Sequence, residues 1–383
     1  MSTVCEKNMC TGCMACVEVC SKGAIKIIDN LESFNAVIQK EKCIGCNMCK
    51  HVCQNNSTLD LRKPVKWQQG WSNNDHFRGN GASGGIATSL MESFIEKKNG
   101  YVCGCTFSNG IFKFEIVNQV NQINRFAGSK YVKSNPKSIY KDIRRLLHDE
   151  KNVLFIGLPC QVAGLKKFIS KDMVNLYTID LICHGTPSQK LLERYLCEHD
   201  FDLSTFKDLR FREKSGFRLN DQFNPITNKD LPDRYLFAFL KSLIYTDNCY
   251  HCNFAGEKRI SDITLGDSWG SNLSMEDQRK GISLAMTQTK KGEELVNIAN
   301  VHLEDVDKTV AMKHNAQLNR PVSYNDKRDK FFDYLKNGKK FDFIIFKLYP
   351  IIFIRQYIKY ILKKIGIIRG GVSIIRYGLY YKD

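Results

Sequence analysis

The chain has 383 residues, enough for two or three domains of about 150 residues each. Hydrophobic residues make up 43% and charged residues 25%, which excludes a disordered, collagen-like or coiled-coil chain. Lys and Arg number 57 against 40 Asp and Glu, and the formal net charge of +17 indicates a polyanionic partner such as nucleic acid or an acidic membrane. The 16 cysteines are too few for a small disulfide scaffold and many for a cytoplasmic enzyme.

The expected compartment decides what the cysteines can do. The first residues contain no apolar run typical of a secretory signal. No charge-free apolar run approaches the ~18 residues that a membrane-spanning helix needs. We therefore expect a cytoplasmic protein, in which clustered thiols indicate metal or redox chemistry rather than disulfides.

Residues 1–61 contain two copies of one motif, Cys-x2-Cys-x2-Cys-x3-Cys, repeated with a period of 33 residues. Three thiolates at this spacing can each reach a different iron of one cubane, while the fourth points to the other cubane. The expected ligand sets of two 4Fe–4S clusters are Cys10, Cys13, Cys16 and Cys53, and Cys43, Cys46, Cys49 and Cys20. Zinc sites also use x2 spacing, but two complete repeats favour clusters.

This module resembles a bacterial-type ferredoxin carrying two 4Fe–4S clusters. Ser21 and Gln54 stand where that family usually has the proline after the fourth cysteine, which loosens the loop exit but removes no ligand. Short apolar runs at 24–28 and 34–38 predict strands between the cysteine loops.

Beyond residue 61, helical and strand-like segments alternate. Residues 62–79 are polar, contain Pro64, and are predicted to be a linker. Strands are expected over 101–107, 112–117, 152–156 and 174–182, and helices over 86–97, 138–148 and 162–169. The alternation predicts a mainly parallel sheet covered on both faces, so the expected class is α/β, preceded by an α+β ferredoxin-like module.

Four more cysteines fall in or near loops at the carboxyl ends of these strands, where α/β sheets place their functional residues. Cys160 and Cys183 follow two of the strands, and Cys249 and Cys252 form a later Cys-x2-Cys pair. Together they could hold a third cluster or a zinc ion. Singly, Cys160 and Cys183 are more often buried structural thiols.

Other thiols and a histidine have simpler interpretations. Cys103 and Cys105 lie in an apolar strand and are expected in the core, and Cys5 and Cys197 have no partner in the cysteine pattern. His184 follows a candidate ligand and is the one candidate for proton transfer, although a histidine that only packs is the more frequent case.

Residues 79–85 read Gly-Asn-Gly-Ala-Ser-Gly-Gly and match the spacing G-x-G-x-x-G at Gly79, Gly81 and Gly84. No hydrophobic strand precedes them, so the dinucleotide-binding context is missing. A helix beginning near Gly85 could still bind a phosphate through its free amides, and a glycine-rich turn without a ligand is the alternative. A second segment, 128–131, could bring a lysine and an aromatic ring to a nucleotide.

Several segments resemble, in order, the coenzyme F-420 hydrogenase/dehydrogenase beta-subunit family. They are SGGIATSLM, AGSKYVKS, LFIGLPCQVAGLK, DLICHGTPS, FREKSGF, CYHCNFAGEKRISDITLGDSWG and GISL. The resemblance divides the domain into an N-terminal region, 80–155, and a C-terminal region, 156–320. It implies a bound FAD beside a 4Fe–4S cluster, with electrons passing between clusters and a two-electron carrier, in some members the deazaflavin F-420.

Carried over by motif, the resemblance also implies site residues. It makes Cys160, Cys183, Cys249 and Cys252 candidate ligands of the third 4Fe–4S cluster. Its candidates for holding FAD are Ser83, Gly84, Gly85, Thr88, Ser129, Lys130, Tyr131, Asp267 and Trp269.

Residues 339–383 form a basic tail with ten Lys or Arg and two Asp, a balance of +8. Arg355, Lys359 and Lys363 recur four residues apart, and their apolar flank, which predicts an amphipathic helix, consists of Ile354, Ile358, Ile361, Leu362 and Ile365. Such a helix can lie on an anionic membrane surface, or it can pack on the domain or on a partner subunit, and both alternatives stand.

We therefore expect a cytoplasmic iron–sulfur flavoprotein oxidoreductase that passes electrons between a two-electron carrier at FAD and 4Fe–4S clusters. The tail allows a peripheral position at the inner face of the membrane. The alternative is a non-catalytic electron-transfer subunit that serves a partner enzyme, and flavin content separates the two.

The expected partner is a redox protein or a soluble two-electron carrier, not nucleic acid. A zinc-bearing nucleic-acid binder ranks last, because the core domain lacks basic clusters interleaved with aromatic residues in its sequence. Each oxidised cubane also adds about −2, and the tail supplies +8, so the body of the protein is only mildly basic.

Overall fold

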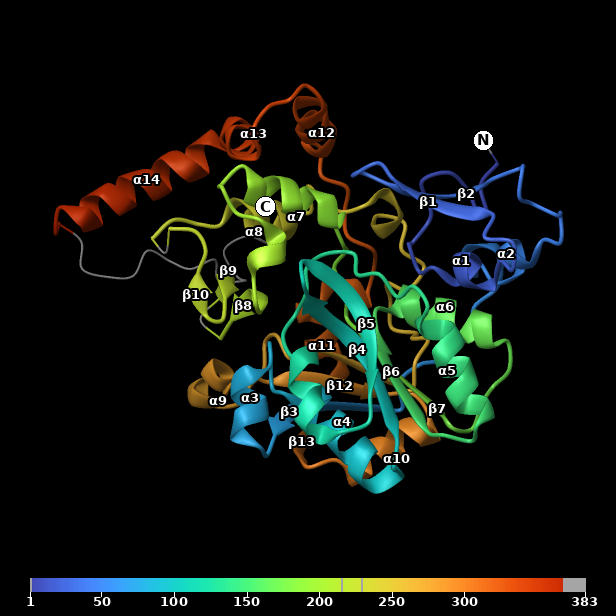
Figure 1. Ribbon diagram of the computed structural model, residues 1–383. Coiled ribbons are helices and arrows are strands. Elements are labelled where there is room, and N and C mark those ends of the chain that lie inside the picture. Colours follow the sequence, from blue (N-terminus) through green and yellow to red (C-terminus); the bar gives the residue numbers. More distant parts are fainter. Residues whose placement is uncertain (1, 215, 229, 368–383) are drawn as a thin grey trace.

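An eight-stranded mixed sheet forms the centre of the protein, with strand order β13-β3-β12-β11-β7-β6-β4-β5 (Figure 1). The computed structural model describes residues 2–214, 216–228 and 230–367. The strands are β3 (Lys66–Ser72), β4 (Tyr101–Ser108), β5 (Ile111–Val117), β6 (Val153–Gly157), β7 (Leu176–Leu181), β11 (Ile263–Asp267), β12 (Ser283–Thr287) and β13 (Val301–Asp305). Strands β11, β7, β6 and β4 run parallel, and the flanking pairs are antiparallel. The predicted α/β class is confirmed, with parallel pairing confined to the centre of the sheet.

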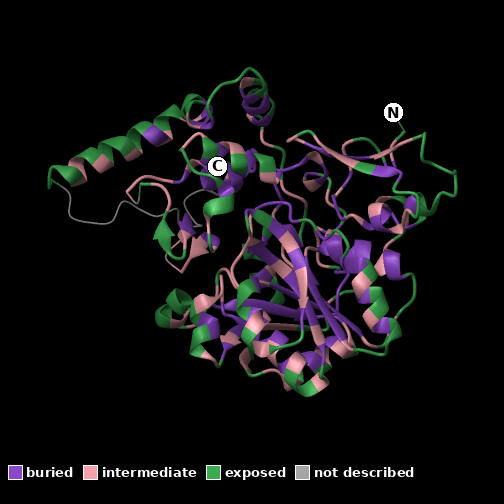
Figure 2. Cartoon of the chain, viewed as in Figure 1, coloured by how far each residue is buried: buried purple, intermediate pink, exposed green. Residues whose placement is uncertain are grey.

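Helices cover both faces of this sheet. On one face lie α4 (Ile86–Lys98) and α10 (Lys290–Ile298), and on the other α5 (Ile139–His148) and α6 (Pro159–Ile169). Strand β6 is buried along its whole length because both of its faces are covered, and Figure 2 shows this buried sheet beneath partly exposed helices. The strands and helices predicted between 86 and 182 all form, with ends that differ by up to three residues.

Residues 62–79, expected as a linker, enter the sheet instead. Strand β3 pairs with β12 and β13, and α3 (Asp75–Asn80) follows it. The strand is polar because buried side chains pair there: Gln69 accepts a hydrogen bond from Ser268 Oγ at 2.8 Å and donates one to Asn272 Oδ1 at 3.0 Å. Since α3 separates β3 from the glycine-rich segment, the direct strand-to-helix turn of dinucleotide-binding folds does not form.

The N-terminal module packs against α5 and α6 (Figure 1). It has an antiparallel hairpin and two short helices: β1 (Ile25–Asp29), β2 (Phe34–Ile38), α1 (Ala15–Val19) and α2 (Met48–His51). Both predicted strands form. At Gly164 on α6 the approach is so close that an added Cβ would lie 2.9 Å from Cys13 Sγ. The module and the α/β domain therefore share one apolar core.

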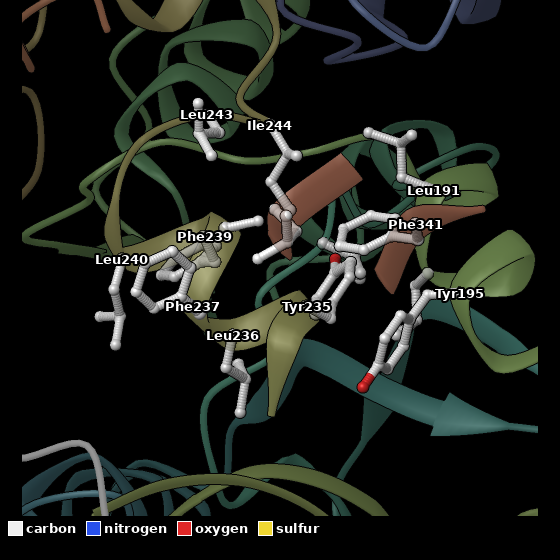
Figure 3. Packing of buried hydrophobic residues seen from close by; sticks show 14 of the residues in the cluster. Leu191, Tyr195, Tyr235, Leu236, Phe237, Phe239, Leu240, Leu243, Ile244 and Phe341 are labelled. Atoms are coloured by element: carbon white, nitrogen blue, oxygen red, sulfur yellow. The ribbon is translucent and has the colours of Figure 1, made fainter. Parts of the chain in front are cut away.

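A second, aromatic core is built by residues 189–250 and the C-terminal helices (Figure 3). Its elements are α7 (Gln189–Cys197), β8 (Leu209–Glu213), β9 (Gly216–Asp221), β10 (Asn224–Pro225), α8 (Arg234–Leu240), α12 (Arg328–Lys336) and α13 (Phe341–Leu348). Tyr235 on α8 donates a hydrogen bond to Tyr131 O at 2.9 Å, and the ring of Phe239 stacks on that of Tyr131 with centroids 4.4 Å apart. This core therefore reaches the 128–131 segment.

The described part of the basic tail consists of α13 and α14 (Pro350–Lys364). Residues 368–383 of the predicted tail lie outside the described residues. Within the described ranges, no helix is both long and apolar enough to cross a bilayer. The remaining short elements are α9 (Met275–Lys280), α11 (Lys308–His314) and the 3-10 turns η1 (Gln54–Asn56), η2 (Val120–Phe126), η3 (Leu203–Thr205), η4 (Asp247–Cys249) and η5 (Ala316–Leu318).

Candidate redox site

The eight thiols of the N-terminal module lie in two tight loops and the helices that follow them. Those expected on the first cluster, Cys10, Cys13, Cys16 and Cys53, are all buried. The second set differs, because Cys43 and Cys46 are exposed. Backbone amides donate to these sulfurs, from Ala24 to Cys20 at 3.2 Å and from Gly45 to Cys43 at 3.5 Å. N–H groups aimed at cysteine sulfur are typical of iron–sulfur ligands.

The chemistry of this donor set fits a bound cluster. Burial raises the pKa of the Cys13 and Cys16 thiols, so both stay neutral unless a cation binds their sulfurs. Among the residues that the structure describes, no three Cys, His, Asp or Glu side chains are placed to chelate one metal ion. Cubane ligands need no such convergence, because each thiolate binds a different iron.

A ninth thiol, Cys5, is buried in the same module. The sequence pattern offered it no partner, yet its sulfur accepts a hydrogen bond from Asn55 Nδ2 at 3.8 Å. Spacing could not reveal this contact, since Cys5 lies outside the repeat and the chain around it is held in place by pairing with β2.

The four later cysteines meet around one cavity of about 40 Å³. Cys160 begins α6 after β6, Cys183 follows β7, and Cys249 and Cys252 come from η4 and the turn after it. Because β6 and β7 are adjacent and parallel, their carboxyl ends bring the first two thiols together, as expected.

Polar donors surround the sulfur of Cys249. It accepts a hydrogen bond from the backbone N–H of Thr186 at 3.4 Å and lies 3.6 Å from Thr246 Oγ1 and 3.8 Å from Asn248 Nδ2. A buried thiol that only packs has no need of such donors, whereas a negatively charged, metal-bound sulfur is stabilised by them.

A larger cavity of about 280 Å³ lies beside the first, near the lower end of the ~300–1,000 Å³ typical of ligand sites. Eight of the nine residues predicted to hold FAD line it: Ser83, Gly85, Thr88, Ser129, Lys130, Tyr131, Asp267 and Trp269. Gly84 does not line it but packs against the sheet, where an added Cβ would lie 2.4 Å from Gly70 O.

Arg212 is the main cavity residue that the sequence motifs did not single out. Its guanidinium forms a bidentate ion pair with Asp267 at 2.6 and 2.9 Å and lies 5.2 Å over the ring of Trp269. It stands in the FREKSGF segment, but a motif alone could not show that it points into this cavity. Other lining residues found only in the structure are Gln161, Phe217, Phe239 and Asn315.

Lys130 is turned toward its own loop. Its Nζ donates to the carbonyl oxygens of Phe126, Ala127 and Gly128 at 2.8–3.1 Å. Burial lowers the pKa of this lysine to about 8. Its first role is therefore to hold the loop that forms one wall of the larger cavity.

The two cavities meet at a shared wall formed by Leu158, Cys183, His184, Gly185 and Thr186. Burial lowers the pKa of His184 to about 4, so its imidazole is neutral at pH 7. At Gly185 the backbone has φ of 140° and an added Cβ would lie 2.3 Å from the Tyr245 ring, so glycine is required there.

A lysine lies between the smaller cavity and the N-terminal module. Lys133 is only 7% exposed, donates from Nζ to Thr11 O at 3.2 Å, and lines the smaller cavity with Cys160. Burial raises the pKa of the Cys160 thiol, and the positive charge of Lys133 opposes that shift. The ammonium is thus placed to stabilise negative charge on the sulfurs of Cys160 and Cys183 at the smaller cavity.

Two family models match this chain. Residues 150–309 match the family described as the C terminus of the beta subunit of coenzyme F420 hydrogenase/dehydrogenase, and residues 9–58 match a 4Fe-4S dicluster domain. These matches confirm the resemblance predicted from the motifs. They indicate that the chain is an iron–sulfur redox protein that transfers electrons.

Among solved structures, a chain of the F420-reducing NiFe hydrogenase complex from Methanosarcina barkeri is similar to this one. The two are 18% identical, with a TM-score of 0.49 over 74% of this chain and 97% of that chain. A search of the curated proteins finds no match.

Proposed function

We propose that the chain is an iron–sulfur flavoprotein oxidoreductase that passes electrons between a two-electron carrier at FAD and 4Fe–4S clusters. The observation that carries this proposal is the shared wall: a ligand-sized cavity and a four-cysteine cavity have Cys183 in common. A flavin accepts two electrons together and releases them singly, which matches one-electron clusters next to it.

At the larger cavity, different residues would bind different parts of the flavin cofactor. Ser83, Gly85 and Thr88 lie at the N-terminus of α4, where backbone amides and the helix dipole favour a phosphate. Tyr131 and Trp269 would lie along the flavin ring, and the Arg212–Asp267 pair would orient it. His184, neutral and at the shared wall, stays the candidate for moving a proton.

A path from the smaller cavity to the N-terminal module is short. Met9, Thr11 and Asn55 of the module line the cavity that Cys160, Cys183, Cys249 and Cys252 surround. On α6, Cys160 and Gly164 are four residues apart and so lie on one face, and Gly164 touches Cys13. We place a third 4Fe–4S cluster at these four thiols, one helical turn from the first cluster of the module.

Electrons would enter or leave at the exposed end of the module. Cys43 and Cys46 are exposed, and between them Ile44 has 65% of its surface free. The second cluster would therefore meet a partner redox protein at residues 42–48, while the first stays insulated. We propose that these electron transfers take place within three parts of the chain, residues 1–61, 80–155 and 156–320.

The test is anaerobic purification with assays for iron, acid-labile sulfide and FAD. We expect about twelve irons and one FAD per chain, whereas about eight irons would remove the third cluster. Full iron without flavin, even after supplementation with FAD, would favour the non-catalytic electron-transfer subunit.

A pair of matched variants locates the flavin. Arg212→Met should lower FAD content, because Arg212 lines the cavity. Arg78→Met is the control: Arg78 also pairs with an aspartate, Asp277, and stacks on a tryptophan, Trp71, but it does not line this cavity. Equal FAD content in the two variants would contradict the placement.

We further propose that α14 lies on an anionic membrane surface. An isoleucine stripe faces away from the body: Ile351, Ile354, Ile358, Ile361 and Ile365 are 47–65% exposed, whereas Phe353 on the opposite side is buried in the aromatic core. Figure 2 shows that α14 as a whole is largely exposed. Arg355 and Lys359 flank the stripe, and no Asp or Glu occurs from 343 to 367. An exposed apolar stripe between cationic residues complements anionic lipid.

Ile358→Asp should reduce binding to vesicles containing phosphatidylglycerol by roughly tenfold or more, since burying one isoleucine contributes about 1.5–3 kcal/mol. The control is Ile111→Asp, because Ile111 is also 51% exposed but lies on β5. Vesicle flotation measures the effect, with phosphatidylcholine vesicles as the uncharged comparison. If Ile358→Asp changes the mass of the protein measured by sedimentation but not the fraction that floats with vesicles, the stripe binds protein and the membrane proposal is wrong.

A further inference from the structure

Two outer loops of the N-terminal module form an exposed surface at the site of the second cluster. Every residue of 40–48, the loop between β2 and α2, is exposed (Figure 2). The exposed turn 21–23 lies beside it, because Gln39 N donates to Ala24 O at 2.8 Å and so joins the two loops. We call these loops, together with Lys50 on α2, the module tip.

The module tip presents apolar side chains next to the thiols proposed to bind the second cluster. Ile44 has 65% and Met48 has 47% of its surface free, and the exposed Cys43 and Cys46 stand beside them in the chain. Apolar side chains at the centre of a contact exclude water, and close contact shortens the path of an electron between two proteins. The tip therefore has the apolar centre that a protein partner needs.

Basic residues accompany this apolar centre. The tip contains four lysines and one acidic residue, a balance of +3, and all five are exposed: Lys22, Lys40, Lys42, Lys50 and Glu41. Within the described residues none of these lysines forms an ion pair, in contrast to Lys336, which pairs with Glu32. Their charges are thus free to attract an anionic surface.

The charge of the tip decides which occupant fits it. A second copy of this chain is excluded, because two tips of +3 would repel each other and the whole chain carries +17. An acidic protein is complementary to the lysines, and its own apolar centre would cover Ile44 and Met48.

We propose that the module tip is the docking surface for a small acidic electron-carrier protein. In the contact the reduced centre of the carrier loses one electron and the second cluster gains it, or the reverse, and no bond is made or broken. The inference rests on the second cluster of the proposed function and adds the charge and the contact surface of the partner.

The test measures, by anaerobic stopped flow, how fast a reduced acidic two-cluster ferredoxin, freed of its reductant, passes electrons to the oxidised full-length protein. The rate constant should fall at least tenfold between 0.01 M and 1 M salt, because the screening length falls from about 30 Å to about 3 Å. Lys42→Glu should lower it by a further factor of about three to ten at low salt and have no effect at 1 M.

The matched control is Lys290→Glu, since Lys290 is also exposed but lies on α10, at the opposite end of the protein from the module (Figure 1). It should leave the rate constant unchanged. Ile44→Ser should lower the rate constant at both salt concentrations, because it removes apolar contact and not charge. Where Lys42→Glu loses iron, Lys42→Gln takes its place with a smaller effect of the same sign.

The remaining outcomes separate this inference from the function on which it rests. A wild-type protein without iron overturns the proposed function. If dithionite reduces the clusters but the ferredoxin rate does not depend on salt, or Lys42→Glu and Lys290→Glu behave alike, the docking proposal is overturned and the function stands. A shift in the reduction potential of the second cluster that accounts for the slower rate in Lys42→Glu also overturns it. So does a loss of vesicle flotation in Lys42→Glu at an unchanged rate, which would assign the tip to lipid.

Discussion

Replacing Cys252 by serine should lower the iron content from about twelve to about eight per chain and leave the spectrum of the N-terminal clusters unchanged. A hydroxyl has nearly the shape of a thiol but binds iron poorly, so the cavity survives and the cluster does not. Electrons delivered to the flavin should then no longer reach the module within the turnover time. Iron assay and stopped-flow reduction by a two-electron donor measure both effects.

Two further serine variants test whether iron is lost because a cluster ligand is removed or because any cysteine is removed. Cys197 is exposed on α7, and Cys105 lies on β4 beside the larger cavity but away from the smaller one. Both variants should keep about twelve irons. An unchanged iron content in Cys252→Ser, or an equal loss in Cys197→Ser, would rule out a cluster at Cys160, Cys183, Cys249 and Cys252.

Replacing Arg259 by methionine should destabilise the protein by about 3–5 kcal/mol, because it leaves the carboxylate of Asp180 buried without its cation. Arg259 is 2% exposed and Asp180 is fully buried, with Nη2 and Oδ1 2.9 Å apart. The same guanidinium donates to Leu181 O at 3.0 Å and Phe254 O at 2.8 Å. It therefore joins the chain just before Cys183 to the chain just after Cys252.

Thermal unfolding under argon measures the effect, and a melting temperature about 4–6 °C lower is expected for a loss of this size in a chain of 383 residues. The double variant Asp180→Leu/Arg259→Met is the control. It removes both charges, so it should be more stable than Arg259→Met alone. If the two variants have the same melting temperature, the unpaired carboxylate is not the cause of the lower stability, and the cause is instead the loss of packing around Arg259.

Periodicity in the sequence was enough to find the centre of the fold. Strands such as β6 and β7 are short apolar runs bounded by turn residues, and α5 carries a regular apolar face, so each was predictable. The cysteine repeat was predictable for a different reason, because metal ligation restricts both residue type and spacing.

Features that depend on distant partners were not predictable. Strand β3 shows no alternation of apolar and polar residues. Gln69 and Ser72 are buried there, and they hydrogen-bond to residues that lie near them only in the folded chain. The partnership of Arg212 with Asp267 spans 55 residues, and Cys5 meets Asn55, 50 residues further on, in a segment that pairs with β2. No local pattern encodes such contacts, because they arise only when separate segments pack.

The glycine at 164 limits how this protein could be recombined. Any side chain there would push against Cys13, so the surface of α6 is shaped for this particular module. A ferredoxin from another protein, even with all of its cysteines in place, would not fit against α6 unless its first loop were equally flat. The N-terminal module and the α/β domain are thus expected to be transferred between proteins only as a pair. Chimeras that join one of them to a foreign partner near residue 61 should need compensating changes on α6.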